Sequence, residues 1–161
     1  MRKILIFSIL CVLFAVQSCK ENRLINLRKE LLIDDDNYIR LYIQSFNDME
    51  ANLKRQEEIK YEIKGKLSGK KFSKIYQGIS IADFQMWNDK IVLFSLNGFL
   101  LYNPFTNQDE WIYKNEHTFI RHPLVEIDDD TGNIYAFCSL YPEMNKILLA
   151  INIHKKTAST L

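Results

Sequence analysis

Twelve residues carry the strongest fold signal of this chain: Ile91-Val92-Leu93-Phe94-Ser95-Leu96-Asn97-Gly98-Phe99-Leu100-Leu101-Tyr102. Two apolar runs flank Asn97-Gly98, and Asn-Gly in that setting is the strongest short-range signal of a β-hairpin. Neither run alternates with polar residues, as a strand with one solvated face would. We therefore predict an antiparallel hairpin with Asn97-Gly98 as its two-residue turn and with both faces buried.

The strand pattern continues on both sides of this hairpin. Strands are predicted at 79–87 and 110–114, and Pro104 ends the strand 99–103. A second series follows with strands at 123–127, 134–139 and 147–153, and no fourth strand is expected after it. The apolar run 147–151 again predicts burial on both faces.

The two series repeat at a fixed interval. Ile91–Phe94 and Ile134–Phe137 lie about 43 residues apart, a period typical of propeller blades. The units 77–114 and 122–157 resemble blades of the β-propeller proteins found among exported bacterial lipoproteins, in which an Asp-rich turn closing on Gly-Asn precedes an apolar strand. The stretch from Asp128 to Ile134 has that form.

The resemblance implies a mainly β fold of antiparallel hairpins that form two to three propeller-type blades. Because propellers have about four to eight blades, this would be an incomplete propeller. A truncated product, assembly between chains, and a small antiparallel sandwich or barrel remain as alternatives. Turn residues at 34–37 resemble those of the later units and mark an earlier, more divergent one.

The segment before residue 77 is more polar. A short strand is expected at 29–33, and 38–46 fits both a strand and a helical face, of which we favour the strand. Asn47 followed by Glu50 resembles a helix N-cap pair, so one short helix is predicted within 48–58. The stretch 59–67 alternates as a half-exposed strand.

Six lysines lie on and after this last strand: Lys60, Lys64, Lys66, Lys70, Lys71 and Lys74. Such a cluster could contact anionic lipid headgroups or an acidic glycan. A solvated strand face that discourages edge pairing is the interpretation we favour, because Glu62 lies within the cluster.

The first nineteen residues have the pattern of an export signal. Arg2 and Lys3 precede an apolar run, 4–16, that is shorter than the roughly 20 residues of a membrane-spanning helix. The run ends in Val16-Gln17-Ser18-Cys19, which resembles the lipobox of bacterial lipoproteins. In that family an aliphatic residue stands three places before the cysteine and a small residue directly before it.

The lipobox resemblance implies cleavage before Cys19 and lipidation of that cysteine. The expected organisation is a signal peptide at 1–18, a lipidated N-terminus and tether at 19–30, and a β-rich domain at 31–161. Several acyl chains such as palmitate would hold the protein to a membrane, since one chain binds only marginally. Lys20 stands where some bacteria use Asp for inner-membrane retention, which favours the outer membrane.

Composition limits the partners of the chain. Its formal net charge is +1, and removal of Arg2 and Lys3 leaves −1, so nucleic acid is not expected as a partner. Cleavage discards Cys11 and lipidation uses Cys19, which leaves Cys138 without a disulfide partner. A lone cysteine in an apolar run predicts a buried core residue rather than a reactive thiol.

No residue pattern indicates catalysis or a cofactor. His117, His122 and His154 match no common zinc spacing. Asp128 and Asp130 ahead of Gly132 could begin a calcium loop, but Ser139 stands where an EF-hand has its bidentate Glu, so a plain Asx turn is favoured and no metal is predicted.

These observations predict a lipid-anchored, non-enzymatic binding or scaffold domain of the cell envelope, with the membrane and a protein or glycan as partners. Aromatic residues could form its recognition surface, although a core role for most of them is expected; they are Trp87, Tyr102, Trp111 and Tyr113. The alternatives are a fragment of an exported β-propeller enzyme or sensor and a lipocalin-like carrier.

Overall fold

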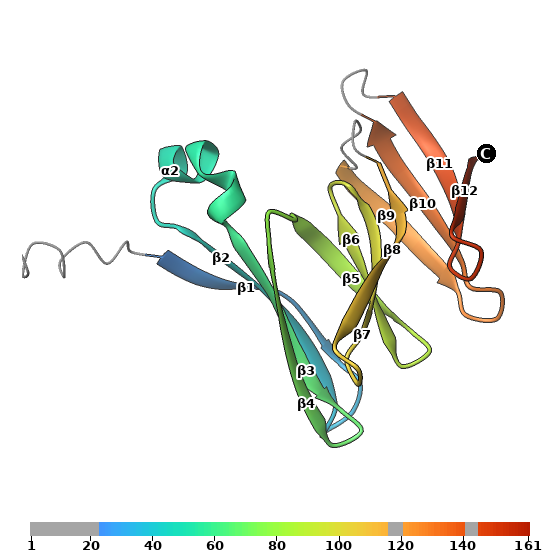
Figure 1. The fold of residues 1–161 in the computed structure, drawn as a ribbon, viewed down its shortest axis with the longest axis horizontal. Coiled ribbons are helices and arrows are strands. Elements are labelled where there is room, and N and C mark those ends of the chain that lie inside the picture. The colour runs from blue at the N-terminus through green and yellow to red at the C-terminus, as the bar shows by residue number, and fades with distance from the viewer. Residues whose placement is uncertain (1–22, 116–120, 141–144) are drawn as a thin grey trace, which may run out of the picture.

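The computed structural model describes residues 23–115, 121–140 and 145–161. In this part of the chain, twelve strands form three four-stranded antiparallel sheets, each made of four consecutive strands. The fold is therefore mainly β, with three units like the blades of a propeller stacked in chain order (Figure 1).

The first sheet comprises β1 (Arg23–Leu32), β2 (Tyr38–Phe46), β3 (Lys60–Leu67) and β4 (Lys70–Gln77). The central sheet comprises β5 (Ile81–Trp87), β6 (Lys90–Ser95), β7 (Gly98–Asn103) and β8 (Gln108–Lys114). The third sheet comprises β9 (Arg121–Asp128), β10 (Asn133–Leu140), β11 (Asn145–Asn152) and β12 (Thr157–Thr160).

The central sheet is buried on both faces, as the sequence predicts. Successive side chains of a strand point to opposite faces. Ile91 and Leu93 accordingly pack in a core with the first sheet, whereas Val92 and Phe94 pack in a core with the third sheet. All four side chains are at most 1% exposed. The uninterrupted apolar run thus reflects two neighbours, one on each side.

The run 147–151 was expected to be buried on both faces, and this prediction is wrong. Leu149 and Ile151 pack in the core with the central sheet, but Leu148 is 37% exposed. Since no described element covers the far side of the third sheet, an apolar run here does not indicate a second neighbour.

The hairpin turn lies one residue earlier than predicted. Ser95 pairs with Gly98, so the two loop residues are Leu96 and Asn97. The Ser95 hydroxyl donates to the Gly98 carbonyl (3.1 Å) and accepts from the Asn97 amide (3.1 Å), which stabilises this register. The adjacent strand β8, rather than the turn, requires glycine at position 98, because a Cβ there would lie 2.1 Å from the Tyr113 carbonyl oxygen.

The first unit is more regular than the sequence indicates. β1 begins at Arg23 and so occupies residues expected to form the tether, because its backbone pairs along the whole of β2 although most of its side chains are exposed. The stretch 38–46 is a strand, as favoured. The predicted short helix is present as α2 (Met49–Lys54), followed by a 3-10 helix at Gln56–Glu58.

The third unit does contain a fourth strand, contrary to expectation. β12 is short and fully exposed, and its four residues carry no hydrophobic alternation that could identify them. Its backbone nevertheless pairs with β11 from Asn152↔Thr157 to Leu149↔Thr160. All three sheets are open, with linear strand orders, and so differ from the single closed barrel of the lipocalin alternative.

Candidate functional site

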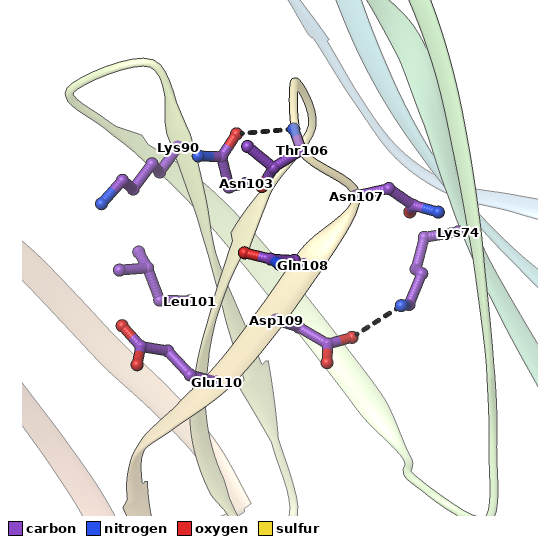
Figure 2. Close-up of a pocket in the computed structure, with 9 residues that line it drawn as sticks. All are labelled: Lys74, Lys90, Leu101, Asn103, Thr106, Asn107, Gln108, Asp109 and Glu110. Carbon is purple, nitrogen blue, oxygen red and sulfur yellow. Dashed lines mark hydrogen bonds and ion pairs between the residues drawn. The ribbon is translucent and has the colours of Figure 1, made fainter.

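A polar groove lies along β8, on the side where the fourth strands of the sheets meet (Figure 2). Its volume is about 600 Å³. The lining side chains are almost all polar or charged and come from the first and central sheets: Lys74, Lys90, Leu101, Asn103, Thr106, Asn107, Gln108, Asp109 and Glu110. The lining therefore suits a polar ligand better than an apolar one.

Ion pairs balance the charges of this groove. Lys74 of β4 lies 3.1 Å from the Asp109 carboxylate, and Lys156, after β11, lies 2.6 Å from Glu110. Each pair joins neighbouring sheets at the fourth-strand edge. Lys90 adds one further positive charge to the lining. The groove therefore offers no strong field of either sign for a charged substrate.

The turn between β7 and β8 forms one wall of the groove. The Asn103 side-chain oxygen accepts from the amides of Phe105 (2.9 Å) and Thr106 (3.3 Å), and the Tyr102 hydroxyl donates to the Asn107 side chain (3.2 Å). Asn107 has a positive φ of 58°, which Asn tolerates better than most residues. These bonds occupy both amide oxygens and fix the wall.

Two buried tyrosines lie close to the Asp109 carboxylate. Burial first, and then the negative charge of Asp109, raises the pKa of Tyr76 above its ordinary value, and the pKa of Tyr102 is raised for the same two reasons. Both hydroxyls therefore stay protonated at neutral pH. The Tyr76 hydroxyl is buried within reach of the Asp109 carboxylate, but it does not meet the geometry of a full hydrogen bond to any described residue. Neither tyrosine is poised as a general base.

Asp128 and Asp130, which could begin a calcium loop, lie in an Asx turn, the interpretation that the sequence favours. The Asp128 carboxylate accepts from the Asp130 amide (3.1 Å), the Thr131 amide (3.2 Å) and the Thr131 hydroxyl (2.6 Å). These bonds, with the hydroxyl first, lower the pKa of Asp128. No group of three His, Cys, Asp or Glu side chains that could hold a metal occurs in the described residues.

The four aromatic candidates contribute mainly to the two cores. Trp87 is 4% exposed and meets the His154 ring edge-to-face at 5.2 Å, and Tyr102 is fully buried. Trp111 and Tyr113 are partly buried and pack against opposite cores. The four residues do not form a shared surface, which agrees with the core role expected for most of them.

The remaining sequence candidates fall into two groups. Cys19 and His117 lie outside the described residues, and the side chain of His122 is likewise not described. Cys138 is buried, as expected, and burial raises the pKa of its thiol. A protonated, buried thiol is a poor nucleophile.

The lysine cluster is spread over two faces, and three of its six lysines form ion pairs. Lys64 and Lys66 point outward and pair with Glu62 (3.2 Å) and Asp36 (2.9 Å), whereas Lys74 points inward to Asp109. The Lys64 ammonium also lies 4.3 Å from the centroid of the Tyr42 ring. This arrangement fits a solvated strand face better than a site for an anionic ligand.

An exposed apolar row crosses the far side of the third sheet. Phe137 is paired with Leu124 on one side and with Leu148 on the other, and the Leu161 amide donates to the Leu148 carbonyl (2.9 Å). We call these four residues the outer apolar row. Their exposed fractions are 43% for Phe137, 75% for Leu124, 37% for Leu148 and 69% for Leu161. Tyr135, which is 38% exposed, lies beside the row.

The sequence could not single out this row. Leu148 belongs to the run 147–151, for which burial on both faces is predicted, and Phe137 belongs to the apolar stretch around Cys138, which is predicted to be core. The repeat spacing does mark these residues as equivalents of a pair that packs on a neighbouring sheet. Phe137 follows Phe94 by about 43 residues, and the pair Phe137↔Leu148 repeats the pair Phe94↔Phe99.

Comparison with known proteins yields no relative. No protein-family model, curated protein or solved structure matches the chain. The fold and its surfaces define the class: a protein of three propeller-type antiparallel sheets with an outer apolar row. None of the helices in the described ranges has the length and apolar composition needed to cross a bilayer.

Proposed function

We propose that the chain is a lipid-anchored protein of the cell envelope that acts as a non-enzymatic binding or scaffold domain. The stretch Val16-Gln17-Ser18-Cys19, with its apolar run, supports the anchor and favours the outer membrane. The described residues supply balanced ion pairs and bonded amides in the polar groove, which support binding rather than bond cleavage.

The outer apolar row is the observation that carries the binding role. The central sheet uses the equivalent position, Phe94 with Phe99, to pack on the third sheet, and those two rings meet at 5.4 Å. The third sheet repeats the arrangement with Phe137 and Leu148, but on this outer face it has no neighbour in the described chain. Its complement is therefore an apolar β-sheet face.

We assign this face to a different protein that presents such a sheet. Head-to-tail stacking of copies of this chain is the less favoured arrangement, because the outer face of the first sheet mixes exposed apolar residues such as Ile25 and Ile75 with ion pairs. There Arg40 pairs with Glu30, and Lys64 pairs with Glu62. Such charged groups would lose their hydration against an apolar row.

Crosslinking in intact cells tests this assignment. A photoreactive residue replaces Phe137 in the full chain, and the matched control replaces Ile25, which is 64% exposed on the first sheet. We expect one defined partner to crosslink from position 137 and not from position 25. Phe137→Lys should abolish binding of the purified partner, whereas Ile25→Lys should preserve it.

Two results would contradict this proposal. Equal crosslinking from positions 137 and 25 would show that the outer apolar row is not a specific surface. Crosslinks between two copies of the chain would instead indicate self-association through the row.

The anchor is tested separately by mass spectrometry of the mature N-terminus. We expect a cleaved chain that begins at Cys19 and carries acyl chains, and Cys19→Ala should abolish both the added mass and membrane retention. An unmodified Cys19 would refute the anchor but leave the crosslinking result intact.

A second candidate function rests on the same outer apolar row. If further blades of a β-propeller pack there, the chain is part of an exported propeller enzyme or sensor whose catalytic residues lie on those blades. A continuous reading frame that encodes additional blades would favour this candidate, and a partner protein captured from position 137 would favour the first.

A further inference from the structure

Apolar side chains are exposed at the end of the molecule that carries α2. Met49 and Leu53, four residues apart on one side of the helix, are 76% and 62% exposed. They border a groove of about 560 Å³ whose other apolar lining includes Ile59, Ile79 and Leu96. This end therefore presents an apolar helix side above an apolar groove.

The start of β1 is fixed at the same end. Arg23 pairs with Phe46, the last residue of β2, and its guanidinium lies 3.4 Å from the Glu58 carboxylate and 4.8 Å from the centroid of the Phe46 ring. Figure 1 shows α2 next to the end of the first sheet where β1 begins. The chain thus enters the fold beside Met49 and Leu53.

The distance from this entry point to the proposed lipid is short. Only Lys20, Glu21 and Asn22 separate Cys19 from Arg23. A fully extended chain spans at most 3.3–3.6 Å per residue, so Cys19 lies within roughly 14 Å of the start of β1. Lipid on Cys19 would hold the α2 end, and no other part of the first sheet, against the bilayer.

We propose that Met49 and Leu53 insert into the membrane leaflet that holds the lipid of Cys19, so that the protein stands on its α2 end. This inference rests on the lipid anchor proposed above. Apolar faces of interfacial helices bury about 5–10 Å into the boundary between headgroups and acyl chains. The groove beside α2 would then receive acyl chains as well.

The charges at this end indicate which lipids it accepts. Four acidic residues, Asp48, Glu50, Glu57 and Glu58, accompany four basic ones, Arg23, Lys54, Arg55 and Lys60. The contact is therefore hydrophobic, without preference for anionic headgroups and with little dependence on salt.

The lysines at the other end of the first sheet lie out of reach of this surface. Lys66 of β3 and Lys71 of β4 lie opposite each other in the strand register, at the end of the sheet where Tyr38 begins β2. β1, with ten residues, separates the two ends by roughly 30 Å, several Debye lengths at physiological salt. Standing on α2, the protein directs these lysines away from the bilayer.

Depth-dependent quenching tests this orientation. The full-length, lipidated protein is reconstituted in phosphatidylcholine vesicles with brominated acyl chains, with a tryptophan introduced as Leu53→Trp. The matched control is Leu32→Trp, since Leu32 is 67% exposed at the far end of β1. The emission of the unsubstituted protein is subtracted first. We then expect the emission added by Leu53→Trp to be blue-shifted and quenched, in low and high salt alike.

The outcomes separate the orientation from the anchor. If Cys19 is acylated and the protein floats with the vesicles, but Leu53→Trp is quenched no more than Leu32→Trp, the orientation is wrong and the anchor stands. If the acyl mass is absent, both proposals fail. Quenching confined to vesicles with anionic lipid would also overturn the inference, because it would show an electrostatic contact.

Discussion

Gly98 shows, at the scale of a single residue, how closely two strands approach in the central sheet. Its φ is +140°, and an added Cβ would lie 2.1 Å from the Tyr113 carbonyl oxygen of β8. Gly98→Ala should therefore lower the free energy of unfolding by roughly 2–3 kcal/mol, because strain and a backbone clash add. Denaturant unfolding of the mature chain measures this change.

Gly69→Ala is the matched control for that substitution. Gly69 also has a positive φ, +77°, but an added Cβ would meet nothing within 4 Å. Only the conformational cost remains, about 1 kcal/mol. Equal losses for the two variants would show that the approach of β8 is not what requires Gly98.

Tyr76 carries a second prediction at the residue scale. Its hydroxyl is buried without a full hydrogen bond to any described residue, so Tyr76→Phe should raise the free energy of unfolding by about 1 kcal/mol at neutral pH. Tyr102→Phe, which loses the hydrogen bond to Asn107, should lower it by a similar amount. Chemical denaturation of both variants checks the opposite signs.

The same tyrosine predicts a pH dependence. The folded state raises the pKa of Tyr76 above its unfolded value of 10.0, by burial and by the charge of Asp109. The stability associated with the neutral hydroxyl is therefore complete below pH 10 and is lost as the pH rises above it. Tyr76→Phe should unfold less readily than the natural protein in that range, and identical alkaline profiles would contradict this assignment.

At the scale of secondary-structure elements, short polar turns connect the strands, and the turn capped by Asp128 offers the clearest test. Asp128→Ala removes the acceptors for Asp130 and Thr131 and should lower the melting temperature, whereas Asp128→Asn retains an acceptor oxygen and should lower it less. Its depressed pKa means that this stabilisation is lost as the pH falls through the folded value. Melting curves from neutral to acidic pH record both effects.

A calcium titration of the same variants separates the turn from a metal site. If Asp128 only caps its turn, added calcium should leave the melting temperature unchanged. A calcium-dependent rise that disappears in Asp128→Ala would mean that the carboxylate binds the ion instead.

The strands of the central sheet could be predicted from the sequence nearly residue by residue. Because Val92 and Leu93 face different cores, every position of the run is apolar, and polar turns mark its two ends. The position of the turn could not be predicted, because the bonds of Ser95 to Asn97 and Gly98 outweigh the intrinsic preference of Asn-Gly.

Elements without a buried pattern escaped prediction for a common reason. β12 and the first half of β1 are held by backbone pairing along β11 and β2, and most of their side chains remain exposed. Hydrophobic periodicity reports burial, so it does not detect such strands. The outer apolar row shows the converse, because Phe137 and Leu148 look buried in the sequence but are exposed in the fold.

At the scale of the whole molecule, the central sheet is the shared wall of two cores. Edge contacts join it to both neighbours: Lys29 lies 2.5 Å from Asp83, and the Gln85 side chain donates to the Val125 carbonyl (3.0 Å). Loss of the central sheet would expose an apolar face on each of the other two. The three sheets should therefore unfold together rather than as separate blades.

Two tryptophans allow this cooperativity to be measured, because each reports on one core. Trp87 belongs to the core of the central and third sheets, and Trp111 packs against the core of the first and central sheets. In Trp111→Phe and Trp87→Phe variants of the mature chain, the remaining tryptophan should show the same change in unfolding midpoint when Val92→Ala or Leu93→Ala is added. Each truncation creates a cavity in only one core and costs about 1–4 kcal/mol. Coupling through the central sheet requires both probes to respond to both cavities. If Trp87 responded to Val92→Ala alone and Trp111 to Leu93→Ala alone, the sheets would be independent blades, each stable without its neighbours.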